Sequence, residues 1–75
     1  MENAELDGLR QGYLNAVDEW RASIRYEEGL ATPDHSMTDV EKWDRAHLAE
    51  EAARAKAKRA RDEYKDALRR VLYGF

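Results

Sequence analysis

The larger apolar residues in the first third of the chain recur every three or four positions. They are Leu6, Leu9, Tyr13, Val17, Trp20 and Ile24. At about 100° of rotation per residue, this spacing places them on one stripe of a helix, with the charged residues outside it. Gly29 suits a left-handed helix cap, and Pro33 prevents the helix from resuming. We therefore predict a helix over residues 4–28 and a connection over residues 29–37.

A second helical segment follows the connection. Thr38 and Glu41 have the spacing of a capping box, which predicts a helix start near Asp39. Neither glycine nor proline occurs from there to Tyr73, and alanine is abundant, so we predict a helix over residues 39–73. Its inward positions have a heptad-like spacing and are mostly methyl groups: Ala46, Ala53, Ala57, Ala60, Tyr64, Ala67 and Val71.

The bulky stripe of the first helix and the small stripe of the second are complementary surfaces. The sequence therefore predicts one all-α domain over residues 1–75, an antiparallel two-helix hairpin resembling a coiled coil, with a longer second helix. With the turn centred near residues 33 and 34, Ile24 faces Trp43, and Trp20 faces Ala46 and His47. Whether the helices pair within one chain or swap between two chains stays open.

This register leaves the end of the second helix without a partner. We call its large apolar residues the apolar tail: Tyr64, Leu68, Val71, Leu72, Tyr73 and Phe75. Such a surface requires a cover. A second copy of the chain, giving a homodimeric four-helix arrangement, is the interpretation we favour. A different protein, or the chain's own residues 1–9, are the alternatives.

Charge divides the chain into two parts. Residues 1–51 carry 13 acidic and 5 basic residues, a net charge of −8, whereas residues 52–75 carry 3 acidic and 8 basic residues, a net charge of +5. Five cations, which we call the basic stripe, share one edge of the second helix: Arg54, Lys58, Arg61, Lys65 and Arg69. They are interpreted first as a solvated face neutralised by Glu50 and by acids near residues 2–7. Contact with phosphates or with an acidic protein is the alternative.

Nucleic-acid binding is the second choice for the basic stripe for two reasons. No aromatic residue lies within the basic run over residues 54–61 to stack on a base, since Tyr64 lies on the apolar face, and the isoelectric point of about 5.3 is opposite to that of a basic domain.

Candidate chemistry is sparse. The chain has no cysteine, which excludes disulfides and thiolate metal sites. Asp44, His47 and Glu51 are ligand types on one helix, but the expected register puts no carboxylate of the first helix opposite them. We therefore expect no metal or other cofactor. His47 is expected to cap or stack on the cluster of Trp20 and Trp43, which are interpreted first as core residues. No nucleophile or phosphate-loop motif occurs, so we expect neither an enzyme nor a small-molecule substrate.

These observations favour a small helical protein-interaction module, an adaptor, regulator or inhibitor that docks on another macromolecule. A nucleic-acid binder using the basic stripe is the alternative function. No apolar run could span a bilayer, so we expect no membrane partner. The acidic first residues lead into no apolar segment, so we expect no secretory signal and a cytoplasmic location.

Overall fold

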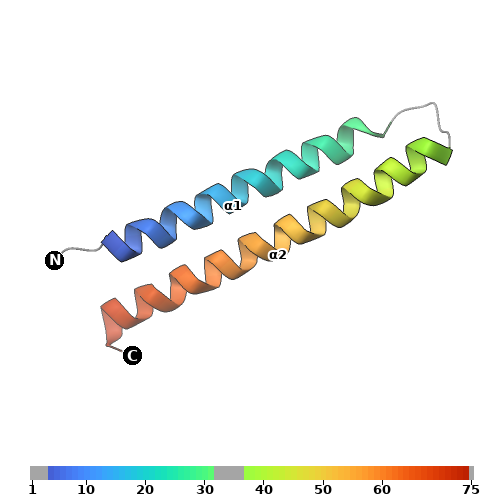
Figure 1. The fold of residues 1–75 in the computed structure, drawn as a ribbon. Coiled ribbons are helices and arrows are strands. Elements are labelled where there is room, and N and C mark those ends of the chain that lie inside the picture. Colours follow the sequence, from blue (N-terminus) through green and yellow to red (C-terminus); the bar gives the residue numbers. More distant parts are fainter. Residues whose placement is uncertain (1–3, 32–36, 75) are drawn as a thin grey trace.

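The protein is a two-helix hairpin. The computed structural model describes residues 4–31 and 37–74, with helix α1 at Ala4–Gly29 and helix α2 at Met37–Tyr73. The helices pack antiparallel within one chain, and the hairpin is 56 Å long but only 17 × 13 Å across (Figure 1). The predicted all-α hairpin with a longer second helix is confirmed. Neither α1 nor α2 is long and apolar enough to cross a membrane.

The helix ends differ in detail from the prediction. Gly29 lies inside α1 and does not have a positive φ. The helix instead tightens at its end, where the amides of Leu30 and Ala31 each donate to a carbonyl three residues earlier, both at 3.1 Å. The left-handed cap expected at Gly29 is therefore wrong, because i→i−3 hydrogen bonds satisfy these last carbonyls.

The capping box is also wrong. Since α2 begins at Met37, Thr38 is a residue of the helix and cannot cap it, and the cap position precedes Met37, outside the described residues. A left-handed cap does occur at the other end of α2. Gly74 has a φ of 75°, and its N–H donates to the carbonyl of Arg70 at 3.0 Å.

The helices approach each other along small side chains. Within the described residues the buried side chains are four alanines, which are 2–4% exposed: Ala16, Ala46, Ala57 and Ala67. The apolar stripe of α1 is half-buried beside them. The prediction that Val71 faces inward is wrong, because Val71 is 40% exposed. The prediction also missed Glu50, which is half-buried. Alanine thus sets a close helix approach, while the bulky residues stay partly open to solvent.

The register differs from the expected one by one to two turns. Trp20 pairs with Glu50 instead of Ala46, and Glu27 reaches His47. Ile24 and Trp43 do line a common hollow. The expected register placed the two helix ends level across a turn centred near residues 33 and 34, whereas α2 begins well beyond the end of α1 (Figure 1).

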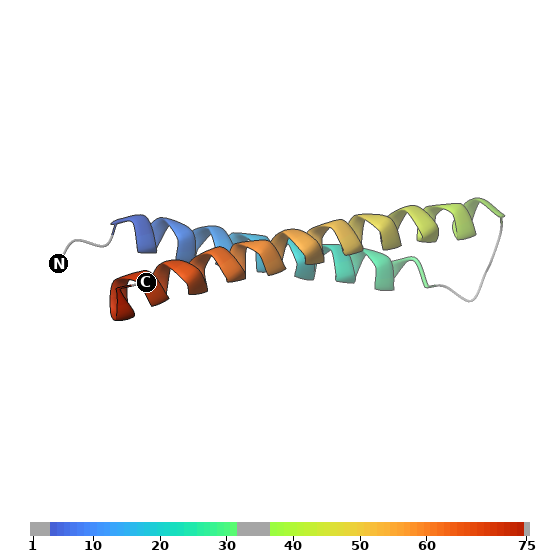
Figure 2. The same cartoon turned by 90° about the horizontal axis from the view of Figure 1, so that it is seen from below.

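The overhang therefore lies at the connection and not at the C-terminus. Figures 1 and 2 both show the start of α1 level with the end of α2, and the first turns of α2 projecting past α1. Met37 and Val40 in this projection are 80% and 47% exposed. At the other end, Ala67 is buried and Tyr64 and Leu68 are half-buried, so a wholly uncovered tail from residue 64 onward is wrong.

Candidate functional site

An apolar hollow with a cationic rim lies along one side of the helix seam. Tyr13, Val17 and Trp20 of α1 line it, opposite three residues of the basic stripe, and Ala57 also contributes. The stripe residues are Arg54, Lys58 and Arg61. On α2 itself the basic run over residues 54–61 contains no aromatic residue, and Tyr64 is half-buried. The aromatic side chains of Tyr13 and Trp20 nevertheless lie beside the stripe, and both belong to α1.

The predicted neutralisation of the basic stripe is only partial. Arg61 and Arg69 contact Asp62 and Asp66, each at 3.5 Å within α2. Glu50 accepts from Trp20 and forms no ion pair with Arg54, and in residues 4–31 no acid of the first turn pairs with the stripe. Among the described residues, Arg54, Lys58 and Lys65 therefore have no ion pair.

The apolar tail is divided between the seam and the surface. Tyr64 and Leu68 are half-buried against the hairpin. Val71, Leu72 and Tyr73 are 40%, 69% and 69% exposed, and Phe75 lies outside the described residues. The exposed part of the predicted interaction surface is therefore the last turn of α2.

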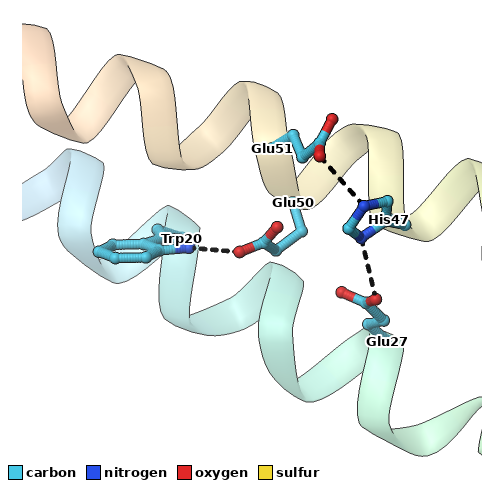
Figure 3. Close-up of polar contacts among 5 residues, drawn as sticks. All are labelled: Trp20, Glu27, His47, Glu50 and Glu51. Carbon is cyan, nitrogen blue, oxygen red and sulfur yellow. Dashed lines mark hydrogen bonds and ion pairs between the residues drawn. The ribbon is translucent and has the colours of Figure 1, made fainter.

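A cluster of Glu27, His47 and Glu50, which we call the Glu–His cluster, joins the two helices near the connection (Figure 3). One ligand atom of each residue lies within 4.8 Å of the others. Nδ1 of His47 is 3.3 Å from Oε1 of Glu27, and its Nε2 is 3.1 Å from Oε1 of Glu51. These are ligand types for a divalent cation, drawn from both helices.

Two expectations about this region were wrong, since the register brings a carboxylate of α1 to His47. No such carboxylate was expected, and His47 was expected to pack on tryptophan. The imidazole instead lies between two carboxylates, with its side chain 55% exposed. Asp44, expected beside it, is exposed and outside the cluster.

The two tryptophans are less enclosed than a core assignment implies. Trp20 is half-buried, and its indole Nε1 donates to Oε1 of Glu50 at 2.9 Å. Trp43 is 39% exposed and lines a hollow with Ile24 and Glu27. A two-helix hairpin offers only one seam, so neither indole can be covered on all sides.

Comparison with known proteins gives no further guide to the site. A scan against protein-family models and searches of curated proteins and of solved structures found no match to this chain. Any function must therefore be inferred from the side chains and their arrangement.

Proposed function

We propose that this chain is a non-enzymatic protein-interaction module whose first partner is a second copy of itself. The dimer would have four helices and would act as an adaptor, regulator or inhibitor by docking on another protein. The observation that carries the proposal is the charge order along one face of α2. This face is continuous with the apolar hollow lined by Tyr13, Val17 and Trp20.

The charge order consists of an acidic block followed by a basic one. The acidic block, near the connection, is Asp44, Glu50 and Glu51, with Glu27 from α1 beside it. The basic stripe begins at Arg54 and continues on the same face at steps of three or four residues. A twofold axis across the hairpin would set the acidic block of one copy on the basic stripe of the other. The face is thus self-complementary, as a twofold interface requires.

Burial supports the same partner. In the described part of the chain, no large apolar side chain is buried. The buried residues there are all alanines. Docking a second hairpin over the hollow would cover the apolar stripe of α1 from the side that the first hairpin leaves open. In small helical proteins such coverage supplies much of the stability that one seam cannot.

A charge-swap experiment tests the dimer. Lys58→Glu with Lys65→Glu lowers the formal charge of the basic stripe from +5 to +1 without removing an ion pair of the described structure. Asp44→Lys with Glu51→Lys raises the formal charge of the acidic block, counted with Glu27, from −4 to 0. By light scattering behind size exclusion, we expect the parent near twice 8.7 kDa, each variant near the monomer mass, and the 1:1 mixture restored to the dimer mass.

Two results would count against this dimer. One is a monomeric parent across a tenfold concentration range. The other is a mixture of variants no heavier than either alone. Val71→Glu with Leu72→Glu is the matched control in the apolar tail, and it is expected to remain dimeric. If it alone became monomeric, the tail and not the charged face would be the dimer surface.

Nucleic-acid binding is the second candidate, favoured by the position of Tyr13 and Trp20 beside Arg54, Lys58 and Arg61. Aromatic faces next to cations suit single-stranded nucleic acid. Anisotropy of a labelled single strand at low salt tests it. Binding should weaken steeply with salt and should be lost in Lys58→Glu with Lys65→Glu. Unchanged anisotropy at micromolar protein would exclude it.

A further inference from the structure

The Glu–His cluster has the spacing of a metal site. Nδ1 of His47 and Oε1 of Glu27 are separated by 3.3 Å. In a tetrahedral site with zinc–ligand bonds of about 2.0–2.2 Å, two ligand atoms are about 3.3–3.6 Å apart. A carboxylate oxygen of Glu50 lies within 4.8 Å of one ligand atom of each of these two residues. A rotation of the half-buried Glu50 carboxylate would therefore complete three protein ligands.

Two of the three ligands have partners that orient them. The indole N–H of Trp20 donates to Oε1 of Glu50, which leaves Oε2 available (Figure 3). The carboxylate of Glu51, 3.1 Å from Nε2 of His47, favours a proton on that nitrogen and leaves the lone pair of Nδ1 on the side of Glu27. In metal sites, the second nitrogen of a histidine ligand usually hydrogen-bonds to a carboxylate, and a carboxylate ligand usually accepts a hydrogen bond from a nearby donor.

The charge of the cluster favours a cation as well. Three carboxylates, of Glu27, Glu50 and Glu51, converge on one imidazole. Within residues 4–31 and 37–74, no lysine or arginine forms an ion pair with any of them. Even a protonated His47 would leave an excess of negative charge between the helices. A dication would compensate it and would join α1 to α2.

We propose that Glu27, His47 and Glu50 bind a first-row transition-metal dication, represented here by Zn²⁺, with Trp20 and Glu51 as positioning residues. One imidazole nitrogen with two carboxylate oxygens suits such an ion, and water would occupy the fourth position. Ca²⁺ requires six to eight oxygen ligands, and Mg²⁺ keeps most of its waters. Both should bind much more weakly. This inference does not depend on the proposed function.

Calorimetric titration of the full chain, free of any affinity tag, with Zn²⁺ tests the site. We expect one Zn²⁺ per chain and a rise in Tm on loading, because the ion binds the folded hairpin. His47→Ala and the conservative Glu27→Gln should each weaken Zn²⁺ binding at least roughly 10–100-fold. This is the loss of affinity typical of removing a residue that only hydrogen-bonds to a metal ligand. The matched controls are His35→Ala, which removes the chain's other histidine, and Glu28→Gln, which changes the neighbouring carboxylate. Both should bind as the parent does.

Ring-nitrogen NMR of His47 tests the predicted geometry directly. Zn²⁺ should shift Nδ1 while Nε2 keeps its proton, and Glu51→Gln should weaken binding without abolishing it. Circular dichroism of each variant without metal confirms that helix content is retained, and Glu27→Gln preserves the test if His47→Ala unfolds. The proposal is overturned by absence of saturable Zn²⁺ binding, by equal affinity in His47→Ala, by metal on Nε2, or by Mg²⁺ binding as tightly as Zn²⁺.

Discussion

Ala67→Leu tests the close approach of the helices at the end where the sequence alone predicted an overhang. Ala67 is 3% exposed, and its neighbours Asp66 and Arg70 line a hollow together with Glu5 and Leu9 of α1. A leucine adds three carbon atoms at a point where the neighbouring helix occupies the space. The substitution must therefore push the helices apart or unwind the last turns of α2.

The size of the effect follows from this packing. Overfilling a well-packed position costs about 1–3 kcal/mol. In a domain of this length each kcal/mol lowers Tm by about 4–8 °C, so we expect a fall of roughly 4–24 °C. The change in helix propensity from alanine to leucine contributes at most a few tenths of a kcal/mol.

Ala55→Leu is the matched control, since Ala55 is an exposed alanine of the same helix. Thermal unfolding followed by circular dichroism should give a Tm near that of the parent for Ala55→Leu and a clearly lower Tm for Ala67→Leu. Equal melting temperatures for the two variants would refute the register, because they would mean that α1 does not cover residue 67.

Three further predictions concern individual contacts. Trp20→Phe removes the donor to Glu50 and should lower the free energy of unfolding by about 1 kcal/mol in a urea titration. This is less than the roughly 1.5–3 kcal/mol of a hydrogen bond to a charged group, because both side chains are partly solvated. An unchanged free energy of unfolding would mean that water replaces this bond fully. Gly74→Ala should speed hydrogen exchange of the residue 74 amide. A left-handed φ costs alanine about 1–2 kcal/mol, so the last turn of α2 should fray. An unaltered exchange rate would contradict the left-handed cap at residue 74. A double-mutant cycle of Glu19→Ala and Lys56→Ala should give a coupling free energy of only about 0.2–1 kcal/mol, which falls as salt is added, because both side chains are more than half exposed. A larger coupling free energy that does not depend on salt would be inconsistent with a surface ion pair.

The sequence by itself determined the two helices and the faces that meet. The stripe from Leu6 to Ile24 could not be buried by any element other than a helix, and alanine at Ala46, Ala57 and Ala67 left a surface shallow enough to accept it. Periodicity is a local property, with a strong signal over more than twenty residues. The hairpin and its approximate helix ends followed from this signal.

Only the tertiary structure decided how far one helix slides along the other. A shift by whole turns keeps both stripes facing each other, so periodicity cannot distinguish the two registers. The choice depends on the sum of many side-chain contacts and on the span of the connection. This choice placed Glu27 beside His47 and Tyr13 beside the basic stripe, and it covered Ala67. Both candidate sites combine residues of two helices, and their existence therefore depended on a register that neither helix encodes alone.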